Sequence, residues 1–180
     1  MLELTIPETE FYDEVRNEFT YVKSTVLRLE HSLVSISKWE SKWKTPFLSK
    51  ATKTHEQSLD YIRCMTINQG VDPAAYYAID NEMMKTVNDY IVEEKTATTF
   101  KENPGARPNR QVITSELVYF WMAQYNIPFE CQKWHFSRLL TLIRIASIKN
   151  QPEKKMSQKA ILSQYKSLNA ARRSAMHSKG

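Results

Sequence analysis

One apolar stretch, residues 113–148, constrains the fold more than any other part of the chain. Of its 36 residues, 21 are apolar, whereas the apolar share of the whole sequence is 42%. Pro128 divides the stretch, because proline lacks a backbone N–H and clashes with the preceding helical turn. We therefore predict one helix from residue 114 or 115 to Tyr125 and a second over residues 129–149, packed together as an antiparallel hairpin.

The side chains of this hairpin predict that it forms the centre of the core. A helix that is apolar around most of its circumference is typically buried. The first helix has this character through Leu117, Val118, Phe120, Trp121 and Met122. The second helix carries one apolar stripe, made of Phe136, Leu139, Leu140, Ile143 and Ala146. The expected fold class is therefore mainly α, a helical bundle around the helix hairpin.

The hairpin does not have the pattern of a membrane protein. A spanning helix requires about 20 predominantly apolar residues, and Glu116, Glu130 and Lys133 interrupt this stretch. The first ten residues contain acids and lack the apolar core of a secretion signal. Cys64 and Cys131 are too few for a disulfide framework and are expected as small buried side chains. We predict a soluble intracellular protein.

The net charge of +5 is distributed unevenly along the 180 residues. Residues 149–180 contain eight Lys or Arg and one acidic residue, so this segment carries +7 and the rest of the chain −2. The length fits one domain, or one domain with an arm. We predict a single helical domain over residues 1–150 and an extended basic helical arm over residues 151–180, which suits an anionic partner or merely favours solubility.

The N-terminal residues allow a small β element. Residues 2–6 alternate apolar and polar side chains, which is the period of a half-buried strand. Residues 26–29 show β-branched and alternating side chains again. Two such segments could pair as a short hairpin within residues 2–30.

Local capping signals predict the next two helices. Ser32 is a good N-cap for the helix that follows it, because its hydroxyl can accept an unpaired backbone N–H. Thr54 is followed three residues later by Gln57, which is the spacing of a capping box. Gly70 is expected to close this second helix, since glycine is common just after a helix C-terminus.

A third helix and a long connection complete the domain. Asp72 and the proline after it are typical of a helix start, and the helix is expected to run to about Glu94, with a bend near Asp80 allowed. Residues 94–111 then change in character and contain turn signals, which predicts a long exposed loop or a short pair of strands. Long loops of this kind are often functional, but a flexible connector is the favoured interpretation.

Side chains that could hold a metal are scattered along the chain. Cys131 and His135 are four residues apart and could share a helix face. With Cys64 and His55 they could complete a tetrahedral zinc site. That site requires two unrelated helices to converge, so buried structural cysteines are the favoured interpretation and no metal or cofactor is expected.

The sequence shows no enzymatic constellation. It contains no phosphate-binding loop, no zinc-protease motif and no nucleophile elbow. Glu30, His31 and Ser32 are neighbours, and adjacent residues rarely converge on one site; His31 is expected on the surface or beside the helix cap. Glu116 and Glu130 stand where helix N-termini favour carboxylates. We therefore predict a protein that is not an enzyme.

The basic arm could contact nucleic acid or protein. Its Lys and Arg side chains spread over several turns, whereas phosphate binding requires a cluster. Tyr165 is its one aromatic side chain for base stacking. A basic helix with a narrow apolar stripe is therefore expected to bind a protein.

Several segments resemble a family of small tailed-bacteriophage proteins. Members are encoded among the tail genes and labelled tail assembly chaperones. The similar segments span most of the chain from about Leu27 onward and are LRLEHSLVSISKWESKWKTPF (Leu27–Phe47), KTATTF (Lys95–Phe100), ITSELVYFWM (Ile113–Met122), IPFECQKWHFSRLLTLIRI (Ile127–Ile145) and LNAARR (Leu168–Arg173).

The resemblance implies a non-enzymatic chaperone that keeps the tape-measure protein soluble during tail assembly in the host cell cytoplasm, without a cofactor. Such a protein needs a surface for amphipathic helices. The protein-binding candidates are Trp39, Trp43, Lys155, Lys159, Tyr165, Lys166, Leu168, Arg172 and Arg173. For Trp39 and Trp43, plain core packing is the favoured alternative.

Two other functions remain open from the sequence. A virion subunit of the head–tail connector, neck or baseplate would use the arm to reach a neighbouring copy, which would make the chain a homo-oligomer. A phage DNA-binding or packaging protein would rest on the basic arm alone.

Overall fold

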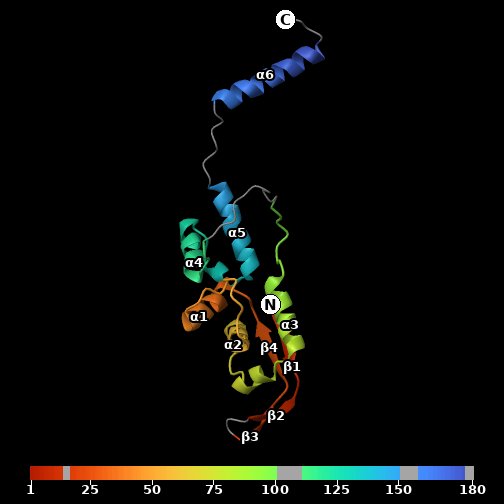
Figure 1. Cartoon of the computed structure of the whole chain (residues 1–180), viewed down its shortest axis with the longest axis vertical. Coiled ribbons are helices and arrows are strands. Elements are labelled where there is room, and N and C mark those ends of the chain that lie inside the picture. The colour runs from red at the N-terminus through yellow and green to blue at the C-terminus, as the bar shows by residue number, and fades with distance from the viewer. Residues whose placement is uncertain (14–16, 101–110, 151–157, 177–180) are drawn as a thin grey trace. The chain divides into compact units, whose positions relative to one another are not determined.

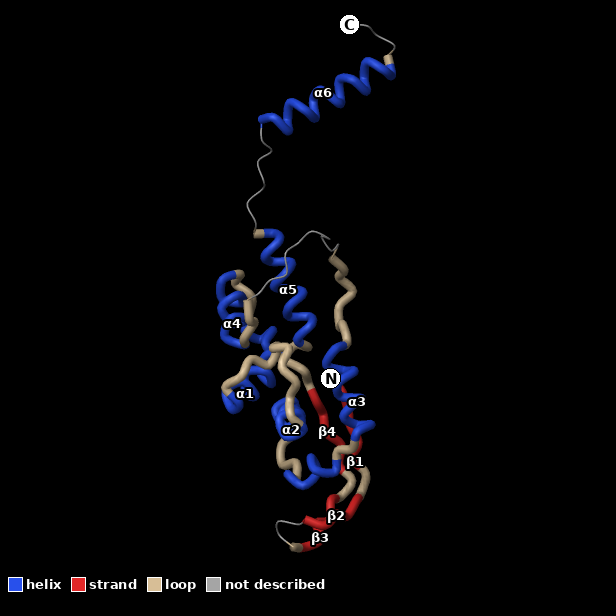
Figure 2. Tube along the Cα trace, in the orientation of Figure 1, coloured by secondary structure: helices blue, strands red, loops and turns tan. Residues whose placement is uncertain are grey.

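The computed structural model describes residues 1–13, 17–100, 111–150 and 158–176. The chain divides into two units, residues 1–149 and 150–180, which are described separately below. The elements of the first unit follow the chain in Figures 1 and 2. They are β1 (Leu2–Ile6), β2 (Thr9–Asp13), β3 (Glu18–Val22), β4 (Thr25–Leu29), α1 (Leu33–Trp43), α2 (His55–Met65), the 3-10 helix η1 (Pro73–Ala78), α3 (Asn81–Val92), α4 (Ser115–Gln124), the 3-10 helix η2 (Phe129–Lys133) and α5 (Phe136–Lys149).

The four strands form two successive antiparallel pairs, which we call the ribbon. β1 pairs with β4, so that Leu2 lies opposite Leu29, and β2 pairs with β3, so that Thr9 lies opposite Val22. Figure 2 shows the two pairs following each other along one hairpin. The strands expected over residues 2–6 and 26–29 are confirmed. β2 and β3 were not predicted, because their sequence mixes helix and strand signals.

Local capping chemistry fixes the starts of α1 and α2 as predicted. The Ser32 hydroxyl accepts from the backbone N–H of Ser35, and Thr54 accepts from that of Gln57. The expected end of α2 at Gly70 is wrong, because the helix already stops at Met65. Gly70 instead occupies a left-handed conformation in the following loop, with a φ of 72°, which glycine adopts without steric cost.

The helix expected over residues 73–94 is broken into η1 and α3. The break falls at Ile79 and Asp80, where only a bend was allowed. The Asp80 carboxylate accepts the backbone N–H of Met83 at 2.7 Å. Asp80 therefore caps a new helix, which is the role that aspartate favours over a place inside a helix.

The predicted helix hairpin is only partly correct. α4 has the expected bounds, but it is not buried all round: Val118 and Met122 are buried, whereas Phe120 is 60% exposed. The second helix starts at Phe136, because residues 129–133 form the separate 3-10 turn η2. An apolar sequence does not say which faces of a helix the rest of the chain will cover.

The expected fold class, a mainly α bundle around this hairpin, is wrong. The chain has mixed α and β content. Helix α2 adjoins β4, α3 adjoins β1, and α1 lies against α2 and α4. The alternating pattern of β1 and β4 turns one apolar face of the ribbon inward, so strands and helices share one core. The most deeply buried side chains include Ile6, Leu27, Leu29, Leu33, Ile36, Trp39, Ile62, Met65, Met122 and Leu139.

The second unit contains helix α6 (Gln158–Ala175). Its described side chains, from Leu162 onward, are exposed. The helix contains four Lys or Arg residues and no Asp or Glu. α6 is thus a basic amphipathic helix whose apolar side chains are uncovered within its own unit.

Candidate protein-interaction surfaces

The apolar stripe of α6 combines three large side chains with positive charge. Leu162, Tyr165 and Leu168 recur every three residues and are exposed, Tyr165 by 61%. Lys166 follows Leu162 by four residues and Arg173 follows it by eleven, which places both along one edge of the stripe. We call this surface the α6 stripe.

The other predicted residues of the arm are placed as follows. Leu168, Arg172 and Arg173 are exposed in the last turns of α6. Lys159 belongs to the first turn, but its side chain lies outside the described part of the chain, and so does Lys155 as a whole.

Trp39 does not offer an interaction surface. Its side chain is 1% exposed, its Nε1 donates to the backbone oxygen of Gln57 at 2.9 Å, and its ring lies 5.2 Å from that of Phe47 in an edge-on arrangement. Trp43 is half-buried and donates its Nε1 to the Asp60 carboxylate at 2.9 Å. The pair joins α1 to α2, so the core interpretation holds for Trp39, and only Trp43 keeps an accessible edge.

A second interaction surface lies on the outer end of the ribbon. The register places Tyr12 opposite Phe19 and Glu10 opposite Tyr21, and side chains of directly paired and diagonal positions share one face. The rings of Tyr12 and Phe19 meet edge to face at 5.2 Å. All three aromatic side chains are exposed, Phe19 by 70%. We call Tyr12, Phe19 and Tyr21 the ribbon face.

Sequence reasoning missed the ribbon face. The usable signal was the alternation of residues 18–22, in which the aromatic residues Phe19 and Tyr21 occupy every second position. Exposed aromatic side chains on a two-stranded ribbon bury no core, so a search for core residues does not find them. Contiguous exposed aromatic groups are typical of interaction sites.

Within the first unit, a buried polar cluster joins α1, α2 and the start of α5. His31 is buried next to the N-cap Ser32, so of its two expected positions the one beside the helix cap is correct and the surface one is wrong. Its Nδ1 lies 2.5 Å from the Tyr61 hydroxyl, and its ring lies 5.3 Å from that of His135. The Ser35 hydroxyl is 3.3 Å from the same Tyr61 oxygen. The cluster satisfies polar groups inside the core, which is a structural role.

The cluster should make stability depend on pH. Burial, and then the nearby His135, lower the pKa of His31 to about 3, whereas an unfolded histidine has a pKa of about 6.5. Between these values the unfolded chain binds more protons. His31 therefore contributes stability that is fully present above pH ~6.5 and falls on acidification, by up to about 1.4 kcal/mol per pH unit. Urea unfolding at several pH values between about 4 and 7.5 measures this slope.

Two variants separate the contribution of His31 to this pH dependence from the contributions of other titratable groups. His31→Phe should flatten the slope between pH ~6.5 and ~5, although it also removes the contact with Tyr61. His55→Gln, on the exposed first turn of α2, should leave the slope unchanged. An unchanged slope in His31→Phe would contradict the assignment.

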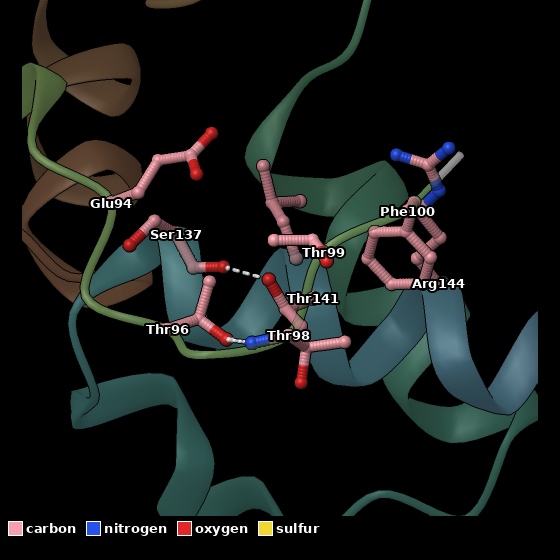
Figure 3. A pocket seen from close by; sticks show the side chains of 9 residues that line it. Glu94, Thr96, Thr98, Thr99, Phe100, Ser137, Thr141 and Arg144 are labelled. Atoms are coloured by element: carbon pink, nitrogen blue, oxygen red, sulfur yellow. Dashed lines mark hydrogen bonds between the residues drawn. The ribbon is translucent and has the colours of Figure 1, made fainter. Parts of the chain in front are cut away.

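Figure 3 shows a surface pocket of about 390 Å³ where the residues after α3 cross α5. Hydroxyl groups of threonines and of Ser137 line it, and the Arg144 guanidinium lies 4.0 Å from the centre of the Phe100 ring. Lys95 N–H donates to the Ser137 hydroxyl at 3.1 Å and ties the segment to α5. The lining has no histidine, cysteine or lysine, but the hydroxyl of its Ser137 lies 2.8 Å from Nδ1 of His135, which stands outside the lining. Residues 95–100 form no strand, and the rest of the expected loop, 101–110, lies outside the described residues.

The residues considered as zinc ligands do not form a metal site in the described part of the chain. Cys131 is buried and Cys64 half-buried, and within the described ranges no three His, Cys, Asp or Glu side chains could together hold a metal ion. Burial raises the pKa of the Cys64 thiol to about 11, which disfavours the thiolate that metals and electrophiles require.

Comparisons with protein-family models, curated proteins and solved structures find no match for this chain. None of the helices in the described ranges is both long and apolar enough to span a membrane.

Proposed function

We propose that this protein is a non-enzymatic tail assembly chaperone of a bacteriophage, which binds the tape-measure protein in the host cell cytoplasm while the tail is built. The resemblance of its sequence segments to that family motivates the proposal. The observation that carries it is the α6 stripe, an uncovered apolar surface on a basic helix in a unit of its own.

The stripe suits a helical partner of opposite charge. Large side chains at Leu162, Tyr165 and Leu168 can pack into the apolar groove of an amphipathic helix, as in other helix-in-groove contacts. Lys166 and Arg173 would face acidic side chains at its edge, where charge sets orientation and the rate of encounter. Such contacts hold an aggregation-prone helix reversibly, as a chaperone must.

Deleting residues 154–180 should weaken partner binding without unfolding the first unit. Strands β1–β4 and helices α1–α5 form their core within residues 1–149, so the melting temperature should shift by only about 2–4 °C or less, the change that about 1 kcal/mol produces in a domain of this size. Affinity for the purified tape-measure protein, measured by calorimetry, should fall at least about tenfold, which corresponds to about 1.4 kcal/mol.

The full-length variant Leu162→Ser/Leu168→Ser is the matched test of the stripe, because it keeps the length and charge of the arm. It should lose affinity as the truncation does. If the truncated chain fails to fold, the division into body and arm is wrong; if both variants bind as wild type, α6 is not the binding surface.

A virion subunit is the second candidate, and the ribbon face favours it. Three exposed aromatic side chains on a paired-strand ribbon resemble the hydrophobic centre of a permanent interface more than the surface of a monomer. A connector, neck or baseplate protein would bury this face against a neighbouring subunit in the mature particle.

A further inference from the structure

The ribbon face and the α6 stripe carry opposite charge. Residues 8–18 contain five acidic residues and one basic residue. Among the acids, Glu8 and Glu10 are exposed beside the aromatic side chains: Glu10 lies opposite Tyr21 in the register, and Glu8 accepts the Tyr21 hydroxyl. The α6 helix has four basic residues and no acid. An aromatic surface with an acidic rim and an aliphatic stripe with a basic rim are complementary in both apolar and charged groups.

We propose that α6 of one copy of this protein binds the ribbon face of a second copy. Leu162 and Leu168 would pack on Phe19 and Tyr21, which supply broad apolar contact. Arginine side chains of α6 stack readily on aromatic rings. Glu8 and Glu10 would pair with Lys166 and Arg173 at the rim.

The geometry of the first unit explains why the occupant belongs to a second copy. Figure 1 shows α5 running away from the end of the unit that holds β2 and β3. The 14 residues of α5 rise about 21 Å, and the ribbon extends about 33 Å further between Leu29 and Phe19. The eight residues between α5 and α6 span at most about 29 Å, which is too short to bring Leu162 of the same chain to Phe19.

Charge reversal in the full-length protein tests the contact. The ribbon variant Glu8→Lys/Glu10→Lys and the arm variant Lys166→Glu/Arg173→Glu change exposed side chains only, so both should keep the wild-type circular dichroism spectrum. Wild type should self-associate in sedimentation velocity over a concentration series, and more weakly at about 1 M salt, where the Debye length falls to about 3 Å. Each variant alone should associate about tenfold more weakly or worse.

Mixing the two variants is the decisive step. In the mixture, the basic ribbon of one variant meets the acidic arm of the other, and the two unchanged surfaces meet as in wild type. Association should therefore return to the wild-type level. Phe19→Ser should weaken association at high as well as low salt, because it removes apolar contact.

The inference is overturned if wild type stays monomeric across the concentration series. It is also overturned if the charge variants associate like wild type. A mixture of the two variants that stays dissociated would overturn it as well, because the complementary surfaces of the two variants would then not bind each other. This contact stands apart from the proposed chaperone activity, although both use α6: a wild type that self-associates but does not bind the tape-measure protein would overturn only the proposed function, and the reverse only this inference.

Discussion

Replacing Trp39 by alanine should lower the free energy of unfolding by about 3–5 kcal/mol, the usual cost of deleting a buried large aromatic side chain. The ring is 1% exposed and packs edge-on against Phe47. Its removal leaves a cavity between α1 and α2 and leaves the Gln57 backbone oxygen without its donor. Urea unfolding followed by circular dichroism measures the change.

Trp134→Ala is the matched control, because Trp134 is a half-exposed tryptophan that packs against Arg138. Its cost should be about 1 kcal/mol or less. Equal losses in the two variants would mean that Trp39 does not belong to the core. If Trp39→Ala kept its stability but lost partner binding, Trp39 would be a binding residue and not a core residue.

The second large effect is expected at Glu40, a buried carboxylate that joins three parts of the first unit. Its two oxygens accept the backbone N–H groups of Phe47 at 2.7 Å and of Ser115 at 2.8 Å. Ser115 is the first residue of α4, so the carboxylate also faces the positive end of that helix. Glu40→Ala leaves two buried donors unpaired and should cost about 2–6 kcal/mol, at about 1–3 for each donor.

Glu40→Gln separates the effect of the two hydrogen bonds on stability from the effect of side-chain packing, because glutamine has nearly the same size as glutamate. Its amide keeps one acceptor oxygen and turns a donor toward the other N–H, so its cost should be smaller than that of alanine. Glu56→Gln, on the exposed first turn of α2, should change stability by about 0.5 kcal/mol or less. Amide exchange at Phe47 and Ser115 should accelerate in the Glu40 variants, and unchanged exchange would contradict the assignment.

The features that were predictable from sequence are local ones. Ser32 and Thr54 cap their helices through contacts three residues away, so the spacing alone contains the information. Residues 2–6 alternate because one side of β1 is buried by the rest of the unit. The bounds of α4 follow from Thr114 as a cap and from the proline after its end.

The features that failed depend on partners distant in sequence. α4 is apolar around most of its circumference, yet of its large apolar side chains only Val118 and Met122 are buried, and nothing within α4 encodes that choice. His31 is buried because Tyr61 and His135 surround it, 30 and more residues away in sequence. The mixed fold escaped prediction for the same reason, since β2 and β3 gain their strand character from pairing with each other.

The same distinction between local features and distant partners applies to the binding candidates. For Trp39 and Trp43, spacing identified a shared helix face but could not show that α2 covers Trp39. For the arm, periodicity alone predicted the exposed stripe of Leu162, Tyr165 and Leu168. The prediction needed no distant partner, because no other element in the described residues of this unit covers the stripe. The ribbon face could not be predicted without the register between β2 and β3, which brings Tyr12, Phe19 and Tyr21 to one face.

Quantitative mass spectrometry of infected cells and of purified particles tests the central claim, that this protein acts during tail assembly through its α6 stripe. The account predicts a protein that is abundant in infected cells, bound to the tape-measure protein there, and absent from mature particles. A fixed copy number per purified particle would contradict it and identify the protein as a structural subunit of the virion.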